Sequence, residues 1–280
     1  MIVVGTAKNV GKTVTFNALR SAAERRGLGY GLTSIGRDGE PADALDGDAK
    51  PRVRVPAGSF IALPEDLVPR SPALEIVELG ARGALGRTVF ARARLATTCE
   101  IGGPPSAGAA RATIDRLRVL AGGPVFVDGA IDRVAPLAGG DDAIVVATGA
   151  ATGAGIERIA EGAADFVARL RTPAYEPARD GAAAVWIAGA LDAARAEALL
   201  GAAAVTVVVA DPTKITVRGR LFATLARHVR LRAERALRVV ACTTSPGGSS
   251  DVSLDPVALV RAVAQATGLP AFDMLARLRA

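Results

Sequence analysis

The sequence is poor in several residue types, and each shortage excludes a class of protein. Two of the 280 residues are cysteines and one is a histidine, His228. Two cysteines are too few for a disulfide framework, and no His/Cys cluster has the spacing of a metal site. We therefore expect reduced thiols and a cytoplasmic protein. Aromatic residues make up 4% of the chain and hydrophobic residues 50%, so a sizeable core must consist mainly of Ala, Val, Leu and Ile.

Long apolar runs are also absent. The longest, residues 199–210, has 12 residues and includes Gly201 and Thr206, whereas a membrane-spanning helix needs about 20. The first residues contain neither the basic region nor the cleavage site of a secretory signal. We therefore expect no membrane partner.

Lysine is scarce although the formal net charge is +6: of 34 basic residues only four are lysines. Two of these, Lys8 and Lys12, follow the first apolar run. A basic chain can bind nucleic acid, and residues 218–238 contain seven arginines. Read as a helix, this segment buries one apolar face and exposes its arginines to solvent. Because no nucleic-acid recognition motif accompanies it, a nucleic-acid partner is the weakest function considered.

The segment between the first predicted strand and the first predicted helix, GTAKNVGKTV, has the residues of a phosphate-binding loop. Backbone N–H groups of such a loop and of the helix start favour an anion. Lys12 brings a flexible positive charge to the β- and γ-phosphates, Gly11 lets the backbone approach them, and Thr13 supplies a hydroxyl ligand for Mg²⁺. Arginine would replace Lys12 poorly, because its planar fork is bulkier than an ammonium group. The predicted nucleotide-binding residues are Gly5, Thr6, Lys8, Asn9, Val10, Gly11, Lys12, Thr13 and Val14.

The loop departs at one position from the pattern G-x-x-x-x-G-K-[ST], which would place a glycine at position 6. That position is Thr6, and Gly5 stands one residue earlier. The G-K-T end and the strand–loop–helix context are intact, so we still predict a phosphate-binding loop.

Two further segments supply candidate residues for metal binding and for the reaction. An apolar strand over 125–127 ends at Asp128, which either binds Mg²⁺ or caps a turn. After the second predicted strand, Arg37 can stabilise phosphate charge, Asp38 can bind Mg²⁺ or order the attacking water, and Glu40 is a weaker candidate; an ordinary polar loop is the alternative. The predicted catalytic residues are Lys12, Arg37 and Asp38, and the predicted Mg²⁺ ligands are Thr13, Asp38 and Asp128.

Predicted strands and helices alternate along the chain, which indicates an α/β fold with a mostly parallel sheet covered by helices. The predicted strands are 2–5, 30–35, 51–55, 74–79, 87–95, 125–127, 143–148, 184–190, 205–210 and 237–242, and the predicted helices are 12–26, 107–121, 155–170, 192–200, 218–229 and 256–267. Residues 36–50 are predicted to form an exposed loop. A break at 172–181 separates a P-loop nucleotide-binding domain, 1–172, from a C-terminal α/β region, 183–280. Residues 211–214 and 243–248 are read as turns or as parts of a partner or substrate surface.

These motifs carry two resemblances. The loop resembles that of dethiobiotin synthetase and its relatives, including the offset first glycine; there Asp128 matches an acid-Gly-Ala segment and Arg37 stands where a lysine is expected. The pieces GTAKNVGKT, GLTSIGRDGE, ELGARGALGRTVFAR, VDGAIDR and VVATGA, in this order, resemble the ATPase subunit of the lysine 5,6-aminomutase reactivase.

The second resemblance implies a P-loop ATPase that uses ATP and Mg²⁺ to release damaged cobalamin from an adenosylcobalamin-dependent aminomutase, together with a second reactivase subunit. The first implies an alternative, a metabolic enzyme in which ATP activates a carboxylate. The absence of an N-K-x-D motif favours ATP over GTP as the nucleotide. Related P-loop families suggest a homodimer.

Overall fold

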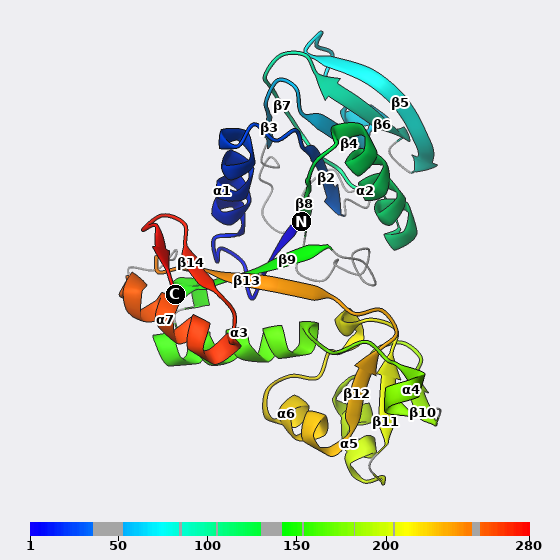
Figure 1. Cartoon of the computed structure of the whole chain (residues 1–280), viewed down its shortest axis with the longest axis vertical. Helices are drawn as coiled ribbons and strands as arrows, with labels where there is room; N and C mark the ends of the chain where they lie inside the picture. Colours follow the sequence, from blue (N-terminus) through cyan, green and yellow to red (C-terminus); the bar gives the residue numbers. More distant parts are fainter. Residues whose placement is uncertain are drawn as a thin grey trace. The chain divides into compact units, whose positions relative to one another are not determined.

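A computed structural model of the chain is shown in Figure 1. The structure describes residues 1–35, 53–83, 86–104, 106–129, 142–152, 154–181, 183–203, 205–247 and 253–280. The chain divides into two compact units, one made of Met1–Ile2 and Phe16–Pro136, the other of Val3–Thr15 and Leu137–Ala280.

The first unit contains a sheet with a parallel and an antiparallel part. Its strand order is β8 (Val125–Gly129), β2 (Gly31–Ile35), β4 (Phe60–Pro64), β6 (Gly86–Ala93) and β5 (Leu74–Gly83). The first three strands are parallel, and the hairpin of β5 and β6 extends the sheet antiparallel to β4. A two-stranded antiparallel sheet, β3 (Val53–Val55) and β7 (Thr97–Cys99), and the short helix η1 (Glu65–Leu67) complete the unit.

Helices cover both faces of the parallel part. Gly31 and Val125 face Leu117 of α2 (Ala107–Ala121), since a Cβ on Gly31 would lie 3.2 Å from the Leu117 Cβ. Phe126 points to the other face, because successive strand residues alternate. There its ring packs edge-on against Phe16 of α1 (Lys12–Arg25), with 6.2 Å between ring centroids. Figure 1 shows α1 and α2 on either side of β2 and β8.

The second unit contains a sheet in the order β15 (Leu278–Arg279), β14 (Ala271–Asp273), β13 (Arg238–Ser245), β9 (Ala143–Gly149) and β1 (Ile2–Gly5). β9, β13 and β14 are parallel and β15 is antiparallel. α3 (Ile156–Leu170) and α7 (Pro256–Thr267) pack on each other and on β13, so they cover one face (Figure 1). The Asp255 carboxylate caps α7 by accepting hydrogen bonds from the N–H groups of Val257 and Ala258.

A separate parallel sheet in the same unit has the order β10 (Ala184–Ile187), β11 (Thr206–Val209) and β12 (Arg230–Ala233). α4 (Pro177–Asp180), α5 (Ala193–Leu200), α6 (Gly219–His228) and η4 (Pro212–Lys214) lie in the same stretch of chain, and η3 (Ala150–Thr152) follows β9. This sheet has its own apolar core, in which Leu191, Val207, Val209 and Leu225 are fully buried.

The predicted α/β class, with mostly parallel strands flanked by helices, is confirmed. The predicted helix 218–229 is confirmed as α6, whereas the interpretation of the whole segment 218–238 as one helix is wrong, because α6 ends at His228 and β12 follows. The strands β4, β7, β12, β14 and β15 were not predicted from the sequence. The domain boundary at 172–183 stays a prediction. β13, which follows this boundary, pairs with β9, which precedes it, and β14 pairs with β13. Among the described residues, no helix has the length and apolar character needed to cross a membrane.

Candidate functional site

The predicted phosphate-binding loop leaves the sheet at the end of β1 and joins α1 at Lys12. The residues of β1 are buried, and the loop after them is tied to the carboxyl end of β9. The Thr6 N–H donates a hydrogen bond to the Ala147 carbonyl at 2.9 Å, and the Thr6 hydroxyl donates to that of Thr148 at 3.0 Å. These two bonds fix the start of the loop at the sheet edge where ligands of open α/β sheets bind.

Gly5 is required by the way the loop folds back on itself. A Cβ at this position would lie 2.8 Å from the Val10 Cγ2 atom and 2.9 Å from the Lys12 Cδ atom. Val10 is 1% exposed, so its side chain has no space into which to withdraw. The structure therefore accounts for the departure from the usual pattern: the close approach occurs at position 5, and the Thr6 side chain binds Thr148 instead.

Two loop residues have left-handed backbone conformations. Asn9 has φ 58° and Gly11 has φ 85°, and both residue types adopt this region more readily than others do. Gly11 also lies against Ser245 at the end of β13, since a Cβ on Gly11 would come within 3.2 Å of the Ser245 Cβ.

The start of α1 is open to an anion. Gly11, which precedes the helix, has no side chain that could cap it, and its carbonyl accepts the first helical hydrogen bond from the Thr15 N–H at 2.9 Å. The first turn of α1 contains no acidic residue. The uncapped N–H groups and the positive end of the helix dipole therefore favour an external anion such as a phosphate.

Lys12 places its ammonium group beside the loop backbone. The Nζ atom donates a hydrogen bond to the Ala7 carbonyl at 3.0 Å. A phosphate oxygen can take the place of this carbonyl, because a hydrogen bond from an ammonium group to a charged oxygen is at least as strong as one to a carbonyl. Lys8, Asn9, Thr13 and Val14 are exposed. The Thr13 hydroxyl is thus accessible to a metal ion that accompanies a phosphate.

The structure adds residues that the sequence analysis did not assign to the site. Thr148 holds Thr6, and the hydroxyl of Thr15 in α1 shares a 2.8 Å hydrogen bond with that of Thr243, both residues being buried. Ser245 contacts Gly11 of the loop, and it belongs to the segment 243–248, which the sequence predicts as a turn or as part of a partner or substrate surface. Thr148, Thr243 and Ser245 share one signal in the sequence, which is their position at the end of an apolar strand.

Two buried polar atoms lie near the same ends of β13 and β14. Thr244 and Asp273 are neighbours in the strand register, and the Thr244 Oγ1 and Asp273 Oδ2 atoms have no hydrogen-bond partner among the described residues. The other oxygen of Asp273 accepts hydrogen bonds from the N–H groups of Leu275 and Ala276. A buried polar atom left unpaired costs about 1–3 kcal/mol, so these atoms are suited to bind a polar ligand group.

The other predicted site residues belong to the first unit or fall outside the described residues. Asp128 is exposed at the end of β8, in register with Ser34 of β2, and both belong to the first unit. Thr13, the other described Mg²⁺ ligand candidate, belongs to the second unit. Arg37, Asp38 and Glu40, with the predicted loop 36–50, lie outside the described residues. In the part of the chain that is described, no group of three or more His, Cys, Asp or Glu side chains could hold a metal ion.

Comparisons of the chain with family models, with curated proteins and with solved structures gave no match. The fold and the loop together define an α/β protein with a glycine-containing loop before an uncapped helix. Chemically, this arrangement can bind a phosphate group through backbone N–H groups and one ammonium group.

Proposed function

We propose that the chain is a P-loop ATPase that binds and hydrolyses ATP with Mg²⁺. One observation carries the proposal: between Gly5 and Thr13, a loop with no room for a Cβ at its start brings an ammonium group to an uncapped helix N-terminus. In this proposal Lys12 binds the phosphates and Thr13 and Asp128 hold Mg²⁺. Arg37 and Asp38 act in the reaction.

We further propose that hydrolysis reactivates an adenosylcobalamin-dependent aminomutase by releasing damaged cobalamin, together with a second reactivase subunit. The ordered sequence pieces that resemble the reactivase ATPase support this role. Hydrolysis can cause a conformational change that acts on the mutase only if the protein makes different contacts with ATP and with ADP.

A metabolic enzyme of the dethiobiotin synthetase type is the second candidate. The steric need for glycine at position 5 favours it, because that offset glycine is the feature through which the loop resembles the synthetase. Activation of a carboxylate would need cationic groups around a small anionic substrate. Outside the loop, lysine occurs only at positions 50 and 214, which makes this the weaker candidate.

The nucleotide site is tested by ATP hydrolysis of variants. We expect Lys12→Ala to lower the rate about 100-fold or more, the usual cost of removing a group that stabilises transition-state charge. Lys12→Arg keeps the charge but should restore little, because the planar fork differs in shape. Lys214→Ala is the matched control, since it removes an exposed lysine from η4. Wild-type hydrolysis by Lys12→Ala would show that the site is wrong.

The role is tested by adding a turnover-inactivated adenosylcobalamin aminomutase and the second subunit. We expect recovery of mutase activity and release of cobalamin that require ATP and are lost in Lys12→Ala. Stimulation of hydrolysis by a small carboxylate substrate, but not by the mutase, would favour the synthetase candidate. Stimulation by DNA that falls with salt would favour a nucleic-acid function.

A further inference from the structure

Two adjoining pockets lie on the three-stranded sheet of the second unit. One, of about 600 Å³, lies at the amino ends of β11 and β12 and is lined by Thr206, Arg227, His228 and Arg230. The other, of about 350 Å³, lies between the end of α3, α6 and β12, and its lining includes Arg171, Arg230 and Arg232. The pockets share Val229 and Arg230, and among the described residues no acidic side chain lines either of them.

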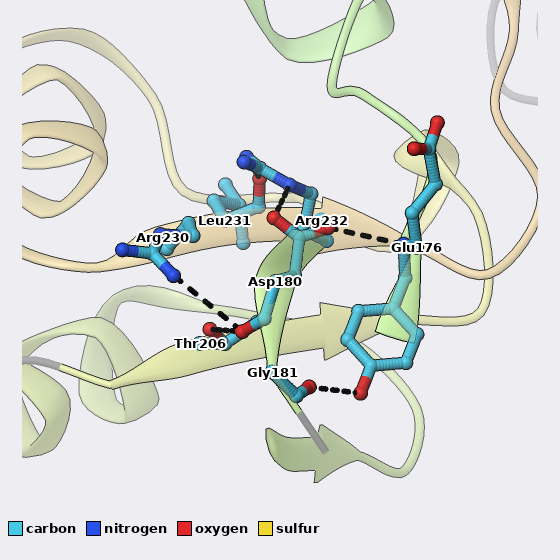
Figure 2. Close-up of polar contacts among 8 residues, drawn as sticks. Glu176, Asp180, Gly181, Thr206, Arg230, Leu231 and Arg232 are labelled. Carbon is cyan, nitrogen blue, oxygen red and sulfur yellow. Dashed lines mark hydrogen bonds and ion pairs between the residues drawn. The ribbon is translucent and has the colours of Figure 1, made fainter. Parts of the chain in front are cut away.

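Arg232, one of these arginines, forms an ion pair with the buried carboxylate of Asp180. The Asp180 carboxylate, 3% exposed, accepts hydrogen bonds from the Arg232 Nε at 2.8 Å and from the Glu176 N–H at 3.0 Å (Figure 2). The Asp180 backbone carbonyl accepts from the Thr206 hydroxyl at 3.0 Å and from Arg230 at 3.4 Å. Arg232 is therefore paired directly with a negative charge. Arg230 hydrogen-bonds the Asp180 carbonyl instead and feels the carboxylate only at longer range.

Three exposed guanidinium groups around the pockets have no ion-pair partner among the described residues: those of Arg171, Arg227 and Arg230. Arg227 makes one hydrogen bond, to the Thr224 hydroxyl at 3.5 Å. Like charges gathered on one surface repel one another and raise the local concentration of anions. This surface is therefore suited to bind a ligand with several negative charges.

The pocket walls favour an acidic protein segment over a nucleic acid. The second pocket is also lined by apolar side chains, among them Leu231 and Phe222, which suits a ligand that has apolar groups as well as charges. Phe222 is 6% exposed, so neither pocket offers an open Phe, Tyr or Trp ring on which a base could stack. The half-buried His228 ring in the first pocket is held by a hydrogen bond with the Ala202 carbonyl at 3.0 Å. Arginine forks bind carboxylates through two parallel hydrogen bonds.

We propose that this surface docks an acidic, partly apolar segment of a partner protein. Carboxylates of the segment bind Arg171, Arg227 and Arg230, and its apolar side chains enter the second pocket. Because the two pockets share Arg230, an extended segment can occupy both. The proposal does not depend on ATP binding, which the loop after β1 would carry out.

The test uses the full chain and a fluorescently labelled synthetic peptide of alternating Glu and Leu, with binding followed by fluorescence anisotropy. We expect Arg230→Gln to weaken binding about tenfold, as for the loss of one charge-assisted pair, and salt to weaken it further. Arg230→Lys keeps the charge and should recover only part of the affinity. Arg261→Gln removes the same charge from the exposed surface of α7 and should leave binding unchanged.

Arg171→Gln and Arg227→Gln change exposed side chains only. They therefore test the proposal even if the Arg230→Gln variant does not fold. Wild-type affinity in all three glutamine variants overturns the proposal. Equal binding of a peptide with Ser in place of Leu overturns the apolar part of it. Tighter, Arg230-dependent binding of an oligo-dT strand than of the peptide replaces the acidic partner with a nucleic acid.

Discussion

The substitution Gly5→Ala tests whether the phosphate-binding loop needs its offset glycine. The new methyl carbon would lie 2.8 Å from the Val10 Cγ2 atom and 2.9 Å from the Lys12 Cδ atom. Carbon atoms in contact normally keep about 3.5–4.0 Å, so both neighbours must move away by about 0.6 Å or more. Lys12 has a flexible side chain and can move, but only by changing where its ammonium group lies.

Val10 cannot move away as easily. It is 1% exposed, and inserting a methyl group into a packed site costs about 1–3 kcal/mol. If the loop relieves this strain by shifting, the N–H groups and Lys12 lose their alignment on a phosphate. About 2 kcal/mol corresponds to about a 30-fold change in affinity. We therefore expect Gly5→Ala to weaken ATP binding about 10- to 100-fold.

Binding of a fluorescent ATP analogue with Mg²⁺ measures the effect, and thermal unfolding shows whether the variant is folded. Gly162→Ala is the matched control, because a Cβ there, within α3, meets nothing within 4 Å. In a helix interior the same change stabilises by about 0.5–1 kcal/mol and should leave ATP binding unchanged. A folded Gly5→Ala protein that binds ATP as tightly as the wild type would refute the steric reasoning.

Three further outcomes are expected. Burial raises the pKa of both Cys99 and Cys242 to about 11, so at pH 8 about one thiol in 1,000 is ionised; a thiol reagent should label neither in the folded protein and both in denaturant. The Glu176 N–H and the Arg232 guanidinium lower the pKa of Asp180 below its ordinary value of 3.8; the stability it contributes is present above that value and is lost as pH falls through the lowered pKa. In urea unfolding, the free energy of unfolding should therefore decrease less on acidification for Asp180→Asn than for the wild type. Thr15→Val should lower the free energy of unfolding by about 1–3 kcal/mol by leaving the Thr243 hydroxyl unpaired, and adding Thr243→Val should restore part of it; equal stability of the single variant and the wild type would contradict this.

The elements that the sequence predicted well are those with local signals at their ends. The predicted helix 107–121 has the bounds of α2. In the structure Ser106 caps its first turn and Gly122, with φ 61°, ends it. α7 begins at Pro256, directly after its capping residue Asp255, for the same kind of reason. The missed strands lack such signals. β14 and β15 have three and two residues, and they become strands because β14 pairs with β13 and β15 pairs with β14.

β12 shows how a charged sequence conceals a strand. Its residues alternate Arg-Leu-Arg-Ala, and Leu231 and Ala233 are buried opposite Val207 and Val209 of β11. The alternation of charged and apolar residues that is typical of a strand is present in the sequence. It spans only four residues and directly follows an amphipathic helix, which conceals it. Parallel pairing with β11, which the sequence does not show, decides the conformation.

For the site, the sequence supplied the loop but not its surroundings. The G-K-T end and the flanking strand and helix are local features, and they sufficed to predict Gly11, Lys12 and Thr13. Thr148 and Ser245 contact the loop from strands far along the chain. Their contribution depends on strand order, and a single sequence contains no direct record of that order.

The composition also does not show what each arginine does, because some arginines are buried and paired while others are exposed. Arg20 is 5% exposed, donates to the Arg54 carbonyl and lies 5.7 Å from the centre of the Phe16 ring. Arg232 is paired with buried Asp180. These two serve the packing of the fold, whereas Arg171 and Arg230 are exposed and without an acidic partner among the described residues.

A net charge of +6 cannot distinguish arginines that stabilise the fold from arginines that await a ligand. Burial and pairing distinguish them. A buried guanidinium depends on hydrogen-bond or ion-pair partners within the protein, whereas an exposed guanidinium can be solvated or can bind a ligand. By that criterion the basic character of the chain is not a uniform background. Part of it is concentrated around two pockets near β12, where a partner with carboxylates would offset the mutual repulsion.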